Sequence, residues 1–205
     1  MYPKIKNSGN WPCSIDEKAG KNYYYHMLKR EKPIGKVRIY KGSAIDFYAD
    51  TVRIQNGKTA VREYTAHAGA AAAIPFLPGN RIILIEQYRY PVKKIMLEIP
   101  AGKILKGENA LQCIKRELAE ETGFSAGKFI HLISFYPTCA FSTEKIDIFA
   151  AYDLKKSTAK PDEDEFIKIK ILNYEEAVAK VKTNKITDSK TIIALLTARC
   201  AKEFR

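Results

Sequence analysis

The sequence GKILKGENALQCIKRELAEETGF, residues 102–124, carries three carboxylates at helical spacing. Glu117, Glu120 and Glu121 stand at i, i+3 and i+4, which places them within roughly 100° of one helix face. Like charges at this spacing destabilise a helix by about 0.2–0.5 kcal/mol per pair. A hard cation such as Mg²⁺, which takes carboxylate and phosphate oxygens as ligands, would offset that repulsion. The stretch therefore predicts a helix that binds a divalent metal.

The residues around these carboxylates are typical of a loop followed by a helix. Gly102 and Gly107 predict a loop that folds back over the start of the helix, and Gly123 has the usual position of a C-cap. Arg116 precedes the acidic residues and can pair with one of them to fix its orientation. Apolar residues at helical spacing predict a stripe that enters the core: Leu111, Ile114 and Leu118.

The same spacing resembles the Nudix box at every fixed position. The matching residues are Gly102, Glu108, Arg116, Glu117, Leu118, Glu120, Glu121, Gly123 and Phe124. The alternative is a solvated acidic helix face with Lys115 and Arg116 as partners. That alternative accounts for any single glutamate, but it does not explain the glycines and the arginine together.

Strand patterns precede the box. Asn56-Gly57 favours a hairpin turn, and a small antiparallel sheet is predicted around it. Two more strands are predicted over residues 70–76 and 81–87, and the apolar run 82–85 suits a strand buried on both faces. The strands of the small sheet are predicted over residues 37–40, 44–54 and 59–67.

Two further segments extend the resemblance. Gln87-Tyr88-Arg89 and the run from Glu98 to Gly102 are similar to the ADP-ribose pyrophosphatase and nucleotide-sugar pyrophosphatase branch of the Nudix hydrolases. The resemblance implies an α+β fold, a Nudix α/β/α sandwich with a mixed sheet behind a small N-terminal antiparallel sheet. It implies an N-terminal extension and sheet over residues 1–66, exchanged across a homodimer, and a catalytic domain over residues 67–205.

The resemblance also implies how the metal and the water are held. Two or three Mg²⁺ or Mn²⁺ ions would bind the three box carboxylates and the backbone carbonyl of Ala101. Glu144, in Ser142-Thr143-Glu144, corresponds to the glutamate that deprotonates the attacking water. A surface-loop glutamate is the alternative reading. One position departs from the branch, because Cys139-Ala140 stands where Pro-Gly is usual, and this leaves the exact substrate open.

Arginine suits substrate binding because its planar fork bonds phosphate oxygens in pairs. Arg89 and Arg62 match the two clamping arginines of the branch, and Glu98 is assigned to the same substrate-binding group. A solvated strand charge is an equal alternative for Arg62. Arg116 is predicted to belong to the catalytic residues. Its expected role is to hold the loop and the helix in shape. The residues with a structural role in the box are Gly102, Glu108 and Gly123.

The residues after the box predict the rest of the domain. His131 alternates with apolar neighbours and is interpreted as structural. The last helix is predicted to start with Asp188 as its N-cap. Its core face is expected to contain Ile192, Ile193, Leu195 and Leu196. The other predicted elements are a strand and loop over residues 129–141, strands over 142–154 and 163–173, and a helix over 174–181.

Composition limits the class of protein. The chain has 205 residues, of which 46% are hydrophobic and 28% charged, as is ordinary for a globular protein. No apolar run reaches the length of a membrane span, and the N-terminus lacks the apolar stretch of a signal peptide, so a cytoplasmic location is expected. Four scattered cysteines suggest neither a zinc site nor a disulfide framework.

The net charge is +12, but the lysines are spread along the chain, and nucleic acid is not the expected partner. We expect metal-dependent hydrolysis of ADP-ribose or a related nucleoside diphosphate sugar to a nucleoside monophosphate and a sugar phosphate. The alternatives are a pyrophosphatase for GDP-mannose or a dinucleotide, and a noncatalytic module that binds a nucleotide or RNA.

Overall fold

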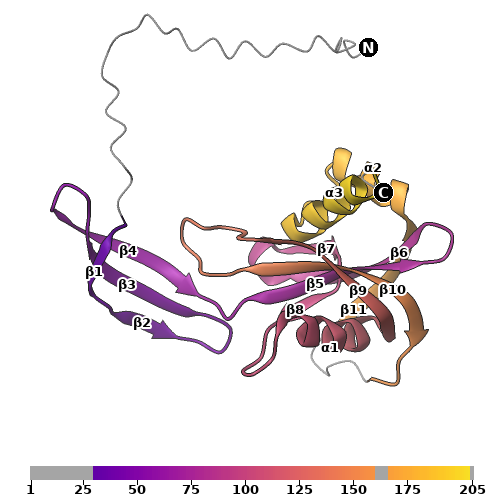
Figure 1. Cartoon of the computed structure of the whole chain (residues 1–205), viewed down its shortest axis with the longest axis horizontal. Coiled ribbons are helices and arrows are strands. Elements are labelled where there is room, and N and C mark those ends of the chain that lie inside the picture. The colour runs from indigo at the N-terminus through magenta and orange to yellow at the C-terminus, as the bar shows by residue number, and fades with distance from the viewer. Residues whose placement is uncertain (1–29, 160–165, 204–205) are drawn as a thin grey trace, which may run out of the picture.

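The computed structural model describes residues 30–159 and 166–203, which fold into two sheets, with helices packed on the larger one (Figure 1). The smaller sheet is antiparallel, and its central strand pairs with all three others. The turn at Asn56-Gly57 is confirmed, because Ile54 N donates to Lys58 O at 2.9 Å and Gly57 has φ of +85°. The strands are β1 (Lys32–Gly35), β2 (Arg38–Lys41), β3 (Asp46–Arg53) and β4 (Thr59–Ala66).

The larger, seven-stranded sheet is mixed. Its order is β11-β6-β5-β10-β9, with β7 paired to β6 and β8 paired to β5. β5 and β10 run parallel, whereas the other pairs are antiparallel. The strands are β5 (Ala70–Leu77), β6 (Arg81–Arg89), β7 (Lys94–Glu98), β8 (Ala101–Lys103), β9 (Phe124–Phe135), β10 (Ile146–Lys156) and β11 (Ile167–Asn173), with a 3₁₀ turn η1 (Tyr90–Val92) after β6.

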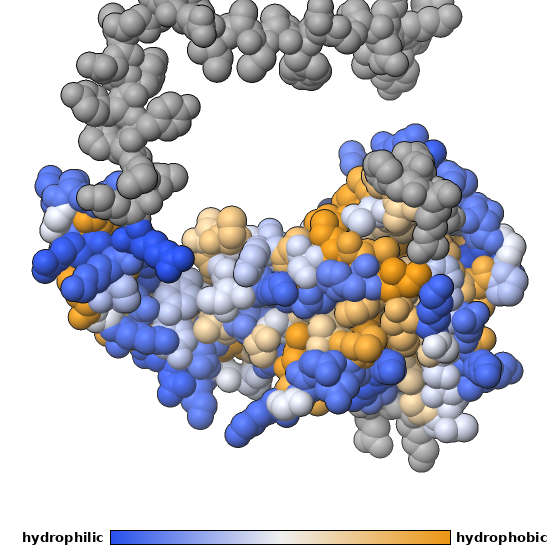
Figure 2. Space-filling view, in the orientation of Figure 1, coloured by the Kyte–Doolittle hydropathy of each residue, from blue (hydrophilic) through white to orange (hydrophobic). Residues whose placement is uncertain are grey.

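Helices cover both faces of this sheet, so the predicted α/β/α sandwich is confirmed (Figure 1). α1 (Ala110–Thr122) packs on one face, and α2 (Tyr174–Lys182) and α3 (Ser189–Glu203) pack on the other. Small side chains allow α1 to lie close to β5, because Ala71 and Ala73 are its neighbours there. On the face seen in Figure 2, apolar residues gather over the larger sheet, above the hydrophilic surface of α1.

The core follows the predicted pattern with two exceptions. Residues 82–85 are fully buried, as the apolar run predicted. Ile114 and Leu118 are buried, but Leu111 is 38% exposed, because Ala110 and Cys113 are the residues of the first turn that pack on the core. Leu195 is buried, but Leu196 is 44% exposed and faces away from the sheet. The prediction of a core position was therefore wrong for Leu111 and Leu196.

Several boundaries also differ from the predictions. β9 starts at Phe124, earlier than predicted, and β10 starts only at Ile146. β1, β7 and β8 were not predicted, because they are too short to show a clear alternation. The undecided Tyr23-Tyr24-Tyr25 segment and the start of the strand predicted from residue 163 lie outside the described residues. None of the described helices is both long and apolar enough to cross a membrane.

Candidate active site

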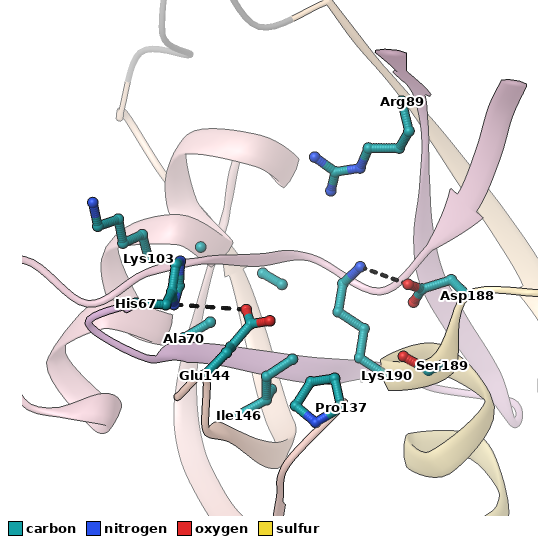
Figure 3. Close-up of a pocket in the computed structure, with 12 residues that line it drawn as sticks. His67, Ala70, Arg89, Lys103, Pro137, Glu144, Ile146, Asp188, Ser189 and Lys190 are labelled. Carbon is teal, nitrogen blue, oxygen red and sulfur yellow. Dashed lines mark hydrogen bonds and ion pairs between the residues drawn. The ribbon is translucent and has the colours of Figure 1, made fainter. Parts of the chain in front are cut away.

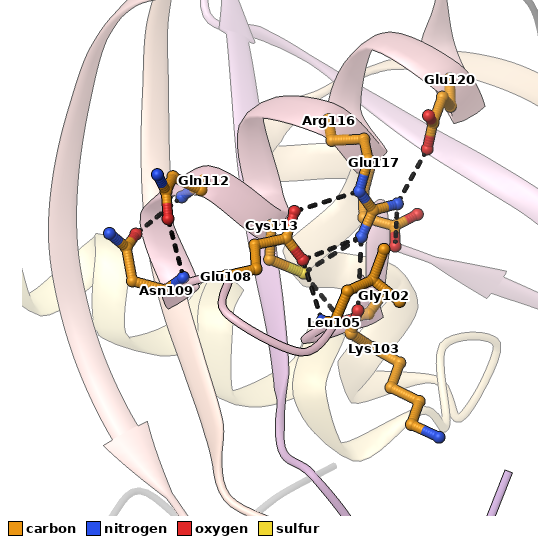
Figure 4. Close-up of polar contacts among 10 residues, drawn as sticks. All are labelled: Gly102, Lys103, Leu105, Glu108, Asn109, Gln112, Cys113, Arg116, Glu117 and Glu120. Carbon is orange, nitrogen blue, oxygen red and sulfur yellow. Dashed lines mark hydrogen bonds and ion pairs between the residues drawn. The ribbon is translucent and has the colours of Figure 1, made fainter.

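The caps of α1 fix the position of its acidic face. Asn109 accepts from Gln112 N at 2.9 Å, and the Gln112 side chain accepts from Asn109 N at 2.9 Å, which forms a capping box (Figure 4). Gly123 ends the helix with φ of +69°, a left-handed conformation that favours glycine. The helix therefore starts and stops at defined residues, and Glu117, Glu120 and Glu121 lie on its last two turns.

Arg116 joins the box loop to the acidic face. Its guanidinium donates to Glu108 through Nε and Nη2, both at 3.1 Å, and through Nη1 to Glu117 at 2.8 Å and Glu120 at 2.9 Å (Figure 4). Glu108 also accepts from Leu105 N at 3.0 Å, so it closes the loop. The hydrogen bond from Arg116 holds the pKa of Glu108 below its usual range. The structure thus places Glu108 and Arg116 where they can shape the loop and the helix.

Gly102 lies directly against one of these carboxylates. A Cβ built on Gly102 would stand 1.8 Å from Cδ of Glu117, well inside contact distance. The φ angle of Gly102 is not in the left-handed region, so the requirement here is space rather than backbone freedom. The first glycine of the box therefore creates the room that Glu117 occupies.

Gly102→Ala is expected to lower kcat about 10²-fold while costing only about 1–3 kcal/mol of unfolding free energy, since overpacking displaces a flexible side chain. The matched control is Gly35→Ala, whose added Cβ would meet nothing closer than 3.7 Å. Steady-state kinetics and urea denaturation of both variants measure the difference. Full activity in Gly102→Ala would show that the position of Glu117 does not matter.

The donors present fit a hard divalent cation. The side chains of Glu117 and Glu120 are 12% and 24% exposed, and they already share one cation, the guanidinium of Arg116. Glu121 is 7% exposed and accepts from Ala101 N at 2.9 Å. Within residues 30–159 and 166–203, no three acidic, cysteine or histidine side chains converge on one point as they stand. The carboxylate oxygens are nevertheless the donor type that Mg²⁺ or Mn²⁺ prefers. In this structure the charge of Arg116 balances Glu117 and Glu120.

A cavity of about 330 Å³ opens beside the box (Figure 3). Four residues singled out from the sequence line it: Arg89, Ala101, Gly102 and Glu144. Four other polar residues line it without any signal in the sequence that marks them as site residues: His67, Lys103, Ser189 and Lys190. Asp188, predicted only as a helix cap, lines it as well. The residues that line the cavity therefore come from the β4–β5 connection, β6, the box, the Glu144 loop and the start of α3.

Arg89 is oriented by a buried carboxylate. Glu98 is only 2% exposed and accepts from Arg89 Nε at 2.9 Å and Nη2 at 2.8 Å. Lys190 also donates to Glu98, and it donates to Asp188 at 3.0 Å. Two residues before Arg89, Gln87 has a buried Oε1 with no hydrogen-bond partner among the described residues, which leaves an acceptor for a water or a ligand.

Other residues singled out from the sequence lie elsewhere. Arg62, on β4, is exposed and donates to Glu31 at 2.5 and 2.9 Å, and it does not line the cavity of its own chain. Glu120 and Glu121 line a neighbouring cavity of about 310 Å³ together with Ile167 and Ile169. Two of the three box carboxylates therefore line this second cavity, and none of the three lines the cavity beside the box.

His131 is also remote from the cavity beside the box. It lies on β9, where its Nε2 is 3.1 Å from Ser134 Oγ and 3.4 Å from Asp147 Oδ1. It does not line that cavity, in keeping with the structural interpretation.

Comparison with known proteins identifies relatives over most of the chain. Residues 66–196 match the model of the NUDIX domain. A methanol dehydrogenase activator of Bacillus methanolicus is 41% identical over 82% of this chain and 92% of its own. An ADP-ribose pyrophosphatase of Bacillus subtilis is 37% identical over 80% of this chain and 90% of its own. A GDP-mannose pyrophosphatase of Yersinia enterocolitica is 33% identical over 66% of this chain and 75% of its own.

A solved structure supports the fold independently. The crystal structure of an ADP compounds hydrolase covers 84% of this chain and 94% of its own, with a TM-score of 0.76 and 21% sequence identity. At this identity the likeness concerns the fold.

Proposed function

The chain belongs to the Nudix hydrolases, and we propose that it hydrolyses the pyrophosphate bond of ADP-ribose or a related nucleoside diphosphate sugar. The observation that carries this proposal is the cavity in which Arg89 and Glu144 stand against Ala101 and Gly102 of the box. The names of two relatives, an ADP-ribose and a GDP-mannose pyrophosphatase, support the same substrate class.

The cavity offers groups suited to an anionic diphosphate. Arg89, Lys103 and Lys190 supply positive charge on its walls. The fork of Arg89 is held by Glu98, so its remaining N–H groups are pre-oriented for phosphate oxygens. The Glu144 carboxylate would take the proton of the attacking water. The products would be a nucleoside monophosphate and a sugar phosphate.

We assign divalent ions, Mg²⁺ or Mn²⁺ and two or three in number, to the box. Glu117, Glu120, Glu121 and the carbonyl of Ala101 would hold them. Such ions supply Lewis-acid stabilisation of the phosphoryl charge and lower the pKa of a bound water. Arg116 would keep Glu117 and Glu120 oriented from the outside of the site, because it also binds Glu108.

We also propose a homodimer in which the small sheet is exchanged. That sheet and its β1–β2 connection carry exposed apolar residues, which a partner would cover: Ile34, Val37, Ile39, Tyr40 and Val61. Arg62 does not reach the cavity of its own chain, so a clamping role for it needs the cavity of a second copy. Sedimentation that shows an active monomer would contradict this arrangement.

The second candidate is another Nudix specificity, for GDP-mannose or a dinucleotide. Cys139-Ala140, where the branch usually has Pro-Gly, lies in the turn that leads to Glu144, so it can change the substrate without changing the chemistry. A noncatalytic nucleotide- or RNA-binding module ranks below both, because all three box carboxylates are present.

Phosphate-monoester release from ADP-ribose, GDP-mannose, UDP-glucose, NADH and diadenosine polyphosphates tests the proposal, with Mg²⁺ or Mn²⁺ and with EDTA. ADP-ribose is expected to be the best substrate, with turnover lost in EDTA by about 10³-fold or more. A preference for GDP-mannose would select the second candidate. Turnover that persists in EDTA, or none on any compound with metal, would overturn the proposal.

A further inference from the structure

The loop that carries Glu144 runs alongside the segment that leaves the small sheet. Thr65 N donates to Phe141 O at 2.9 Å, and Thr143 N donates to Thr65 O at 3.0 Å. Ala70 N donates to Lys145 O at 2.9 Å, and Thr65 and Ser142 form a parallel bridge. The loop is therefore bonded to the end of β4 and to the start of β5, where the chain passes from the small sheet to the large one.

The side chain of Thr143 adds a second link at the same place. Its Oγ1 accepts from His67 N at 2.9 Å and donates to His67 O at 3.3 Å. One hydroxyl thus satisfies both backbone groups of a residue in the connection between the sheets. Because Thr143 directly precedes Glu144, this pair of bonds restrains the backbone from which the carboxylate projects.

His67 itself faces Glu144 across the cavity (Figure 3). Its Nδ1 lies 3.7 Å from Glu144 Oε1, beyond hydrogen-bond distance. The same Nδ1 accepts from Gly69 N at 3.0 Å, so the ring is also bonded to the connection between the sheets. The ring forms one wall beside the carboxylate, and the bonds of Thr143 hold the backbone from which that carboxylate projects.

We propose that Thr143 is a positioning residue for Glu144, and that it couples the placement of the small sheet to the placement of the carboxylate. The inference rests on the proposed role of Glu144 as the base. A second link supports the coupling, because Lys103 Nζ donates to Ser43 O at 3.2 Å and Ala44 O at 3.1 Å in the turn between β2 and β3. Both walls of the cavity are thus bonded to the small sheet or its exit.

A double-mutant cycle on ADP-ribose hydrolysis tests the proposal. Thr143→Val, which removes the hydroxyl at nearly constant volume, is expected to lower kcat about tenfold with KM within about twofold, whereas Thr143→Ser should retain most activity. Glu144→Gln should lower kcat about 10²-fold. In the Glu144→Gln background, Thr143→Val should have less than about a twofold further effect, because it acts through a group already removed.

The control is Thr183→Val, which removes a threonine hydroxyl bonded to Ala179 O at the end of α2. An equal loss from Thr143→Val in both backgrounds would mean a general structural role and would overturn the proposal. Full activity in Glu144→Gln would instead remove the base assignment while the hydrolase function stands.

Hydrogen exchange gives a readout that does not depend on turnover. Thr143→Val should speed amide exchange over residues 138–145 and at His67 about tenfold, while exchange in α1 stays unchanged. Unchanged exchange over residues 138–145 would overturn the proposal even if no substrate in the panel were hydrolysed.

Discussion

Glu120→Gln is expected to lower kcat about 10³-fold, since a carboxylate that holds a catalytic metal contributes several kcal/mol to stabilising the transition state. The substitution keeps the shape of the side chain but removes its charge. Glu120 is 24% exposed and pairs with Arg116, which also binds Glu117 and Glu108. The unfolding free energy should therefore change by no more than about 1 kcal/mol.

Three measurements check this expectation: steady-state kinetics, urea denaturation and Mn²⁺ binding by calorimetry. The matched control is Glu176→Gln on α2, a 51% exposed glutamate that pairs with Lys180 at i,i+4 and lies away from the box. The control should keep both activity and Mn²⁺ binding. Wild-type activity in Glu120→Gln, or unfolding of that variant, would count against Glu120 as a metal ligand.

The local part of the site could be predicted from the sequence because it depends on helical spacing. The positions of Glu117, Glu120 and Glu121 follow from one helix between Asn109 and Gly123, and short-range caps determine that helix. Spacing alone did not predict that Leu111 is exposed. Its burial depends on which side chains of the first turn meet the sheet, which is a property of the tertiary structure.

The remaining part of the site depends on contacts between distant segments. His67, Lys103 and Lys190 reach the cavity because the β4–β5 connection, the box and α3 meet there, and no spacing within one segment signals that meeting. Arg62 was predicted from the sequence but does not line the cavity of its own chain. A plausible match in sequence lies outside the cavity, because the small sheet is a separate layer in the single chain.

Glu98→Gln is expected to cost about 3 kcal/mol of unfolding free energy at neutral pH. Removing one partner of a buried ion pair costs about 3–5 kcal/mol, because the remaining charge is left without compensation. Glu98 is 2% exposed and its two cationic partners are Arg89 and Lys190. The low end of the range applies, because Arg89 is 39% exposed and Lys190 keeps Asp188 as a partner.

The ion pairs of Glu98 with Arg89 and Lys190 should also make the unfolding free energy depend on pH. Burial alone would raise the pKa of Glu98, but the hydrogen bonds and charges of Arg89 and Lys190 outweigh it and hold the pKa below 4.5, its ordinary value. The unfolded chain therefore binds this proton more readily than the folded one. The stabilisation is complete above the unfolded pKa and is lost as the pH falls through the folded pKa.

Urea denaturation of the wild type and Glu98→Gln from pH 7 to pH 3 measures this dependence. The difference between the two proteins should be largest at pH 7 and should narrow below about pH 4, since glutamine cannot titrate. Glu86→Gln is the control, because Glu86 is 32% exposed and pairs with Lys170 at 3.5 Å, a surface pair worth less than about 1 kcal/mol. A difference that stays constant over this pH range would mean that the hydrogen bonds accepted by Glu98, rather than its charge, stabilise the fold.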